Sequence, residues 1–472
     1  MSYKHAVVMD ATPAGGASVP DAEGFAQAGA VPEGLEHRLR DRLHLDELRR
    51  NANSWQGRLA LGLALIGPGV LVMLGDNDAG GVITYAQTGA TYGLGLFLPT
   101  MIVLGFVAYF VQEMTVRLGA VTRRGHAELI WKRYGAFWGW FSLIDLVAAN
   151  VLTLITEFIG IRLGSQALGL SPWLTVPASL AFVAYVLIFM RYWTWERISL
   201  FIAAFNLIFV PLALTSHPDW HAVAGAFAGH GWAVSGGFLS LTFLVLISAN
   251  IGTTIAPWQL FFQQSCVVDK GLLPRDIRAG RRDLMLGVAG MVLVAIAIIV
   301  IAARTLKGVP HPQNLDAAEV LSVIRTKLGG GMMALFALGL MEAGLIASIV
   351  ITASSAWAIG EAFDIDRSIN APPRQAVWFY LPAIVGTVAA AVAVMVPGLP
   401  LGFLNLTVQV IATVFMPAAM LFLLMLLNDR ELMGAHVNSP ARNAVSVAIM
   451  VGLILCNGLY GITVLFPHAL GG

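Results

Sequence analysis

The chain has 472 residues, of which 57% are hydrophobic and only 12% are charged, whereas roughly a quarter of the residues of a soluble domain are charged. This composition excludes an ordinary soluble protein and indicates one that is embedded in a lipid bilayer. The formal net charge is +1, and no basic patch with interleaved aromatic residues favours nucleic-acid binding. Two cysteines, Cys266 and Cys456, provide neither a disulfide framework nor metal-ligand spacing.

Residues 1–54 differ from the rest of the chain. They begin with a stretch rich in Gly, Ala and Pro and continue into LEHRLRDRLHLDELRR, where leucines recur at helical spacing between charged residues. The pattern of a signal peptide, a basic start before a short apolar core and a small-residue cleavage site, is not found there. We expect a cytoplasmic, disordered tail with one short amphipathic helix, followed by a transmembrane domain over residues 55–472.

A helix needs about 20 mostly apolar residues to cross a bilayer, and eleven segments meet this requirement. Lys and Arg gather in segments 38–58, 123–133 and 270–282, whereas segments 215–232 and 396–402 contain none. Because Lys and Arg remain on the cytoplasmic side, we expect the N-terminus inside and the C-terminus outside. The predicted spans are 57–90, 93–119, 136–166, 172–190, 193–215, 236–266, 283–304, 332–361, 375–397, 401–427 and 441–466.

Two of these spans are interrupted by residues that are costly inside a membrane. The first span contains GDNDAGG (residues 75–81), and the sixth contains ANIGTTIAPWQ (residues 249–259), in which Pro257 removes an amide donor. If spans one to five (about 57–215) and six to ten (about 236–427) are repeats, the odd number of spans inverts their topology. Paired broken helices mark the central site of a transporter, and the span at 441–466 is then an extra helix.

The polar residues of the first break favour a cation. Unwound carbonyls and the C-terminal ends of half-helices carry partial negative charge, and Asp78 adds a full charge. Asp76 and Asp78 are two positions apart and do not share a helical face, so we expect Asp78 to contact the ion and Asp76 to line the vestibule or hold water. The structural alternative is an aspartate that caps a helix or bridges two helices.

The residues around these breaks resemble a known family. GPGVLVMLGDNDAGGVITYAQTGATYG is similar to the first-helix signature of the Nramp divalent-metal transporters, and VQEMTVRLGAVTRRGHAELI, LFALGLMEAG and NDRELMG resemble its second helix, its eighth helix and the segment after its tenth. The resemblance covers most of residues 57–466. It implies an all-α membrane protein with a LeuT-like inverted repeat of five plus five helices, helices 1 and 6 broken, and an eleventh helix. It also implies a transporter in a bacterial cytoplasmic membrane that is not an enzyme and has no cofactor besides the transported metal.

The departures from the family pattern bear on the metal. The family's Asp-Pro-Gly-Asn becomes Asp78-Ala79-Gly80-Gly81, and its helix 6 methionine and histidine become Ala256 and Trp258. Without the thioether, carboxylate, carbonyl and water ligands remain, which suit Mg²⁺ and Mn²⁺, and Mg²⁺ keeps several of its waters. This pattern is similar to the Nramp-related magnesium transporters. The resemblance implies a metal site at Asp78, Gly81, Thr253 and Ala256.

Further polar and bulky residues surround this expected site. They could hold the waters of the ion, or they could instead be hydrogen-bond partners of broken helices and neighbouring spans. Where the family has acidic residues on helix 3, this chain has Leu154 and Glu157, and with Trp258 in place of the histidine the proton path is broken. Glu157 and Glu342 are intramembrane acids, functional or packed. The expected surrounding residues are Asp76, Asn77, Gly80, Thr254, Trp258, Gln259 and Gln409.

Together these features predict import of Mg²⁺, and also of Mn²⁺, by alternating access without proton coupling. A membrane potential of about 100 mV supplies roughly 4.6 kcal/mol for a dication. The alternatives are a proton-coupled Mn²⁺ or Fe²⁺ importer and, with less support, a sodium- or proton-coupled carrier of an organic solute, whose carboxylate Asp78 would repel. A passive channel would not need two broken helices in opposed repeats. The sequence does not determine the oligomeric state.

Overall fold

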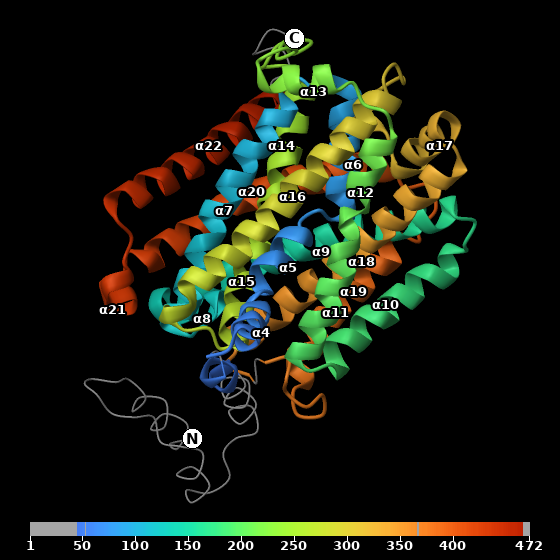
Figure 1. Ribbon diagram of the computed structural model, residues 1–472. Coiled ribbons are helices and arrows are strands. Elements are labelled where there is room, and N and C mark those ends of the chain that lie inside the picture. The colour runs from blue at the N-terminus through green and yellow to red at the C-terminus, as the bar shows by residue number, and fades with distance from the viewer. Residues whose placement is uncertain (1–44, 52, 366–367, 466–472) are drawn as a thin grey trace, which may run out of the picture.

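The computed structural model describes residues 45–51, 53–365 and 368–465, and this part of the chain is helical with no strand. Figure 1 shows a bundle in which the broken helices lie at the centre, α22 at one edge and α10 at the other. Of the segment predicted as a tail, residues 1–54, residues 1–44 and residue 52 lie outside the described residues. Residues 45–50, inside the segment predicted to form the amphipathic helix, are helical.

Helices from the first predicted repeat run from residue 55 to residue 215, and one short helix follows them. Their bounds are α4 (Trp55–Leu65), α5 (Pro68–Leu74), α6 (Ala79–Tyr92), α7 (Phe97–Thr122), α8 (His126–Tyr134), α9 (Ala136–Ala167), α10 (Pro172–Phe189), α11 (Tyr192–Ala204), the 3-10 turn η1 (Phe205–Ile208), α12 (Phe209–Thr215) and α13 (Trp220–Phe227).

Helices from the second predicted repeat run from residue 241 to residue 427, and the chain then turns back into a last long helix. Their bounds are α14 (Leu241–Thr254), α15 (Pro257–Asp269), η2 (Pro274–Asp276), α16 (Ile277–Thr305), η3 (Pro312–Asn314), α17 (Ala317–Leu328), α18 (Gly330–Ala362), α19 (Val377–Ala393), α20 (Leu401–Leu427), α21 (Arg430–Met433), η4 (Gly434–His436) and α22 (Pro440–Leu465). The additional helix α22 packs against α14 and α20.

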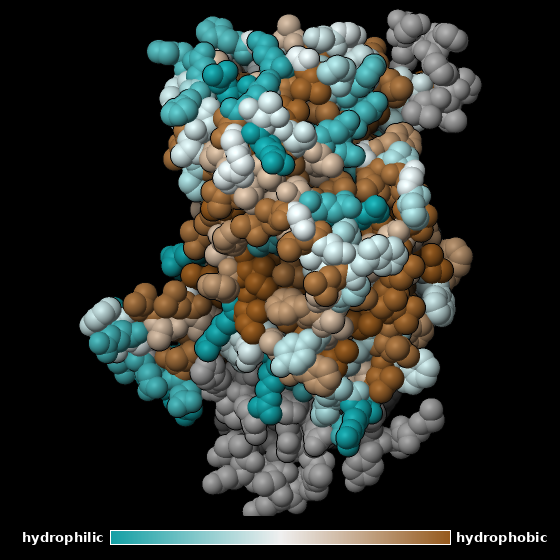
Figure 2. Space-filling model, turned by 90° about the vertical axis from the view of Figure 1, so that its right-hand side faces the viewer, coloured by the Kyte–Doolittle hydropathy of each residue, from teal (hydrophilic) through white to brown (hydrophobic). Residues whose placement is uncertain are grey.

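The described helices have the length and composition of membrane spans. Nine of them, with the halves of a broken or kinked span taken together, are long and apolar enough to cross a bilayer; α4 with α5 would make a tenth, and α19 is a shorter apolar helix of 17 residues. Figure 2 shows hydrophobic residues (brown) over the middle of one face and hydrophilic residues (teal) gathered at its upper end. Nine of the eleven predicted spans therefore correspond to helices long enough to cross a bilayer, the predicted span 375–397 corresponds to the shorter helix α19, and the first predicted span is divided among several helices.

The first predicted span, residues 57–90, is not one helix with a single break. It consists of α4, α5 and α6, and α4 meets α5 at a bend of 45°. Pro68 explains the additional interruption, because proline disfavours a helical conformation in the residue before it and cannot donate an amide hydrogen bond. The expectation of one interruption in this span was wrong for that reason.

Helix α5 packs against α16 almost backbone to backbone. A Cβ added to Gly69 would lie 2.5 Å from the Leu284 amide nitrogen, and one added to Gly287 would lie 2.5 Å from the Gly69 carbonyl oxygen. The Asp283 carboxylate accepts hydrogen bonds from the amides of Gly67 (2.9 Å), Gly69 (2.6 Å) and Val70 (3.2 Å). These amides are the unpaired donors at a helix start, so Asp283 fixes the position at which α5 begins.

Residues 45–50 are docked onto the membrane domain. The Leu45 side chain is completely buried in a small apolar cluster with Val116, Val267 and Ile277. Arg49 forms an ion pair of 2.6 Å with Asp276 in η2. This part of the segment predicted as a tail therefore belongs to the packed structure.

Candidate functional site

The first helix break lies between the end of α5 at Leu74 and the start of α6 at Ala79. Asp78 is the N-cap of α6, and its Oδ1 accepts a hydrogen bond of 2.5 Å from the Gly81 amide. The same oxygen accepts a bond of 3.3 Å from the Thr253 hydroxyl of α14. Asp78 therefore has the capping role that the sequence left open as an alternative, and it also joins the first break to the second.

The second break lies between the end of α14 at Thr254 and the start of α15 at Pro257. In a continuous helix the Thr253 carbonyl would accept a hydrogen bond from the amide of residue 257, but proline has no amide hydrogen. The carbonyl groups at the end of α14 also carry the negative end of the helix dipole. Carbonyl oxygens at this break can therefore serve a cation, as predicted for Thr253.

A second carboxyl group reaches the first break from α9. Glu157 Oε2 accepts a hydrogen bond of 2.9 Å from the Ala79 amide, and Oε1 accepts one of 3.0 Å from the Thr156 hydroxyl. The Glu157 carboxyl group also neighbours that of Asp78. Two adjacent carboxylates repel each other unless a cation or a proton lies with them, so this pair provides a place for positive charge.

Glu342, the other predicted intramembrane acid, does not join this pair. It lies on α18, and both of its carboxyl oxygens are buried without a hydrogen-bond partner among the described residues. The structure thus distinguishes Glu157 from Glu342, which the sequence presents alike as intramembrane acids.

Asp76 is held by a different set of partners from those of Asp78. Its Oδ1 accepts a hydrogen bond from Gln259 Nε2, and Gln112 Nε2 of α7 donates to Gln259 Oε1 at 3.1 Å. Asp76 is only 1% exposed, so in this conformation it does not face an open vestibule. This series of hydrogen bonds, from Asp76 through Gln259 to Gln112, links the first break to α15 and α7.

The Asn77 side chain contacts the seventh predicted span. Its Nδ2 donates to the Met291 carbonyl of α16 at 3.2 Å. Asn206 in η1, which the sequence analysis did not single out, donates to the carbonyls of Leu74 (3.2 Å) and Asn77 (3.1 Å). Asn206 therefore holds the backbone of the first break from the side of the fifth span.

Helix α20 contributes two amide side chains beside Gly80. Asn405 Nδ2 donates to the Gly80 carbonyl at 3.2 Å and to the Thr84 hydroxyl at 3.3 Å. A Cβ added to Gly80 would overlap Gln409 Nε2, so glycine lets the predicted residue Gln409 approach the backbone here. Asn405, Gln409 and Thr413 recur every four residues on α20, and this polar spacing on an apolar helix is a signal that could have identified Asn405.

Thr254 stabilises its own helix. Its hydroxyl donates to the Asn250 carbonyl at 2.7 Å and lies 3.4 Å from the Tyr85 hydroxyl. This is the hydrogen-bonding role expected for Thr254 as the alternative to holding the waters of an ion.

The positions where the family has other side chains, Gly81, Ala256 and Trp258, are all buried. A Cβ added to Gly81 would lie 2.6 Å from Thr253 Oγ1 and 3.1 Å from Asp78 Oδ1. The Thr253 hydroxyl therefore occupies the space beside Gly81 where a side chain would begin. Ala256 is the N-cap of α15 and is buried. The Trp258 indole packs against Phe262, with ring centroids 5.9 Å apart, and lies near Gly75.

Several buried polar atoms around the breaks have no hydrogen-bond partner among the described residues. Buried polar atoms are normally satisfied by protein or by ordered water, so these atoms mark a place for water or a hydrated ion. Among the described residues no group of three or more His, Cys, Asp or Glu side chains forms a preformed metal cluster. The unpartnered atoms are Asp76 Oδ2, Asn77 Oδ1, Asn206 Oδ1, Asn405 Oδ1 and Gln409 Nε2.

Two interrupted helices that meet at buried carboxylates halfway along the bundle define a membrane transporter of the broken-helix class. The family described as natural resistance-associated macrophage protein-like, Nramp, matches residues 69–463, and the chain belongs to this family. The LeuT-like fold and the family resemblance inferred from the sequence are thus confirmed.

Individual relatives and solved structures agree with this assignment. The divalent metal cation transporter MntH of Aeromonas hydrophila is 26% identical over 404 residues, which cover 83% of this chain and 94% of that protein. MntH of Deinococcus radiodurans is 24% identical over 84% of this chain and 89% of its own length. The crystal structure of the Eremococcus coleocola manganese transporter shares the fold, with a TM-score of 0.68 at 20% identity over 87% of this chain and 88% of that one.

Proposed function

We propose that this chain carries divalent metal ions across a bacterial cytoplasmic membrane by alternating access, with the N-terminus inside and the C-terminus outside. The proposal rests on Asp78, which is 2% exposed and joins the two breaks through its bonds to the Gly81 amide and the Thr253 hydroxyl. A buried carboxylate in a membrane marks an ion pathway. Relatives named as divalent metal transporters support the same substrate class.

The proposed ions are Mg²⁺ and Mn²⁺. Both prefer carboxylate, carbonyl and water oxygens, and the two breaks offer oxygen and amide groups, with Ala256 where the family has a thioether. The relative named as a manganese transporter supports Mn²⁺, and the donor set supports Mg²⁺ beside it. A soft ion such as Cd²⁺ would find no sulfur ligand at this position, so we expect it to bind less well relative to Mg²⁺ and Mn²⁺ than in a site with a thioether.

Uptake into proteoliposomes that contain a metal-sensitive dye tests this proposal. We expect the intact protein to take up Mn²⁺, Mg²⁺ to compete for that uptake, and Cd²⁺ to have little effect. Asp78→Asn should reduce uptake to background. Asp219→Asn is the matched control, because Asp219 caps the exposed helix α13 and asparagine is an equally good cap. Normal uptake by Asp78→Asn would overturn the proposal.

Ala256→Met tests the choice of ion. A thioether at this position adds a soft ligand, which favours soft metals. We expect the variant to gain Cd²⁺ uptake and to lose Mg²⁺ uptake. An unchanged ratio of Cd²⁺ to Mg²⁺ uptake would show that residue 256 does not contact the ion.

The proposed driving force is the membrane potential alone. The Leu154 and Trp258 side chains cannot carry a proton, and a dication gains roughly 4.6 kcal/mol from about 100 mV. With a potassium diffusion potential, metal should enter while a pH-sensitive dye inside the liposomes reports no change.

The second candidate is a proton-coupled Mn²⁺ importer, which the neighbouring carboxyl groups of Asp78 and Glu157 favour. Such a pair can hold a proton that the arriving metal displaces. This candidate requires acidification of the lumen in step with Mn²⁺ entry, and loss of that acidification in Glu157→Gln. The two outcomes of the dye measurement separate the candidates.

A further inference from the structure

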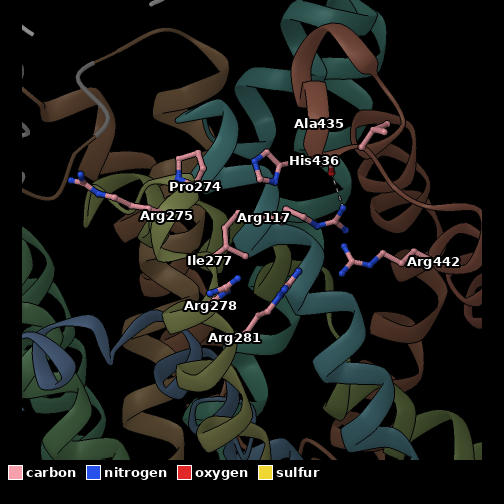
Figure 3. Close-up of a pocket in the computed structure, with 10 residues that line it drawn as sticks. Arg117, Pro274, Arg275, Ile277, Arg278, Arg281, Ala435, His436 and Arg442 are labelled. Carbon is pink, nitrogen blue, oxygen red and sulfur yellow. Dashed lines mark hydrogen bonds between the residues drawn. The ribbon is translucent and has the colours of Figure 1, made fainter. Parts of the chain in front are cut away.

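A basic pocket lies well away from the helix breaks, at the end of the bundle where α7 ends and α16 and α22 begin. Its volume is about 510 Å³, and no lining residue belongs to the candidate metal site. Figure 3 shows that the guanidinium groups of Arg117, Arg281 and Arg442 point toward one another from these three helices. The lining residues are Arg117, Pro274, Arg275, Ile277, Arg278, Arg281, Ala435, His436, Val437 and Arg442.

The positive charge in this pocket exceeds the negative charge beside it. One carboxylate, Glu113, lies 2.6 Å from Arg281, 3.4 Å from Arg117 and 3.8 Å from Arg442. Arg278 has no ion pair within the described part of the chain and is exposed. Three guanidinium groups on one carboxylate repel each other, so an anion in the pocket would stabilise the arrangement.

Arg117 makes the pocket a built site rather than a set of solvated surface charges. Its side chain is only 2% exposed. Its guanidinium donates to the His436 carbonyl at 2.9 Å and to Asn438 Oδ1 at 2.7 Å, while its buried Nε has no partner among the described residues. The packing thus fixes the guanidinium before any ligand arrives, which lowers the entropy cost of binding.

The lining residues also select the chemistry of the anion. All of the lining cations with permanent charge are arginines, and the planar guanidinium fork matches the oxygens of a phosphate group. The pocket lies at the helix ends, which is the depth of the lipid headgroups, and basic pockets between membrane helices bind phosphate headgroups. We propose that this pocket binds a phosphate oxyanion, from an anionic lipid headgroup or from a free phosphate, at a site separate from the metal pathway.

Binding measurements on the full-length protein test this proposal. The probes are dioleoylphosphatidylglycerol and zwitterionic dioleoylphosphatidylcholine, counted on the delipidated protein by native mass spectrometry, and inorganic phosphate, measured by calorimetry. Arg278→Gln with Arg442→Gln removes one exposed and one partly exposed charge and leaves the closer Arg281–Glu113–Arg117 contacts intact. Arg325→Gln on α17, also exposed and outside the pocket, is the matched control.

We expect the double variant to bind its phosphate ligand about tenfold more weakly or worse, and the control to bind as the unchanged protein does. Selective loss of phosphatidylglycerol without competition by inorganic phosphate identifies the ligand as a lipid headgroup. Binding of inorganic phosphate that displaces the lipid identifies a small oxyanion. The proposal is overturned if the double variant binds the phosphate ligand as well as the control does. It is also overturned if the protein shows no preference for phosphatidylglycerol over phosphatidylcholine and does not bind inorganic phosphate. A circular-dichroism spectrum and a melting curve show that the double variant is folded.

Discussion

The Lys270 ammonium group lies 2.9 Å from Glu196 Oε1, and the two side chains are 0% and 2% exposed. Lys270 also donates to the Ile66 carbonyl at 2.8 Å. The pair therefore joins the end of α15, the helix α11 and the link between α4 and α5. These are segments of three different spans, held at the end of the bundle where the described chain begins.

We expect removal of either partner alone to destabilise the protein strongly, because it leaves one charge buried without its counter-charge. Glu196→Gln or Lys270→Met should each lower the free energy of unfolding by about 3–5 kcal/mol. The double variant should lose less than the sum of the two single losses. Thermal melting in detergent measures all four proteins, and additive losses would contradict the coupling.

We expect Gly81→Ala to strain the site. Its Cβ would meet Thr253 Oγ1 at 2.6 Å, and overpacking of this kind costs about 1–3 kcal/mol. Thr253→Ala removes the hydroxyl that the new Cβ meets, so adding it to Gly81→Ala should recover part of the stability and of the Mn²⁺ uptake. If the double variant loses as much stability as the two single variants do in sum, the two side chains do not compete for this space.

We expect Asp283→Ala to loosen the start of α5, because it removes the acceptor of three buried amides. An unsatisfied buried donor costs about 1–3 kcal/mol. Hydrogen exchange should speed up at residues 67, 69 and 70, and Asp283→Asn, which keeps one carbonyl oxygen, should give an intermediate rate. Unchanged exchange at these amides would show that α5 starts there without Asp283.

We expect His126, at the start of α8 and outside the membrane spans, to make stability depend on pH. Burial lowers the pKa of His126 from 6.5 to about 4, so the unfolded chain binds the proton first. The contribution of the neutral His126 to the free energy of unfolding is fully present above pH 6.5. It is lost progressively as the pH falls toward 4, by roughly 3 kcal/mol in all.

His126→Gln should remove that pH dependence while leaving an amide beside Gln264, the side chain that His126 contacts at 3.0 Å. Melting curves between pH 4 and pH 7.5 measure the effect. An equally steep loss of stability in the variant would assign the pH dependence to other groups.

Much of the fold could be predicted because its signals are local. Apolar length marks each span, and Pro257 and the Gly-Asp segment at residues 75–81 mark the two breaks. The position of Asp78 at the junction follows from the same residues. Pro68, by contrast, lies inside a long apolar segment that hides it, although α4 ends before Pro68 for the same reason that α14 ends before Pro257.

The rest of the site depends on contacts between distant residues. Asn206 holds a backbone 129 residues away, and Asp283 accepts hydrogen bonds from amides 213 to 216 residues away. A lone amide or carboxyl group in an apolar helix looks the same in the sequence whether it binds an ion, a backbone or nothing. Gly81 is a related case: the sequence shows that this position has no side chain, but not that the Thr253 hydroxyl of α14 lies beside it.

The glycine contact between α5 and α16 restricts how this protein can change shape. At Gly69 and Gly287 the two backbones touch, so turning α5 about its own axis would bring a Val70 or Leu71 side chain to a place with no room for one. Sliding α5 by one turn would place the bulky Met73 where Gly69 lies. During a transport cycle α5 must therefore move together with α16 as one rigid body, or separate from it along the whole contact.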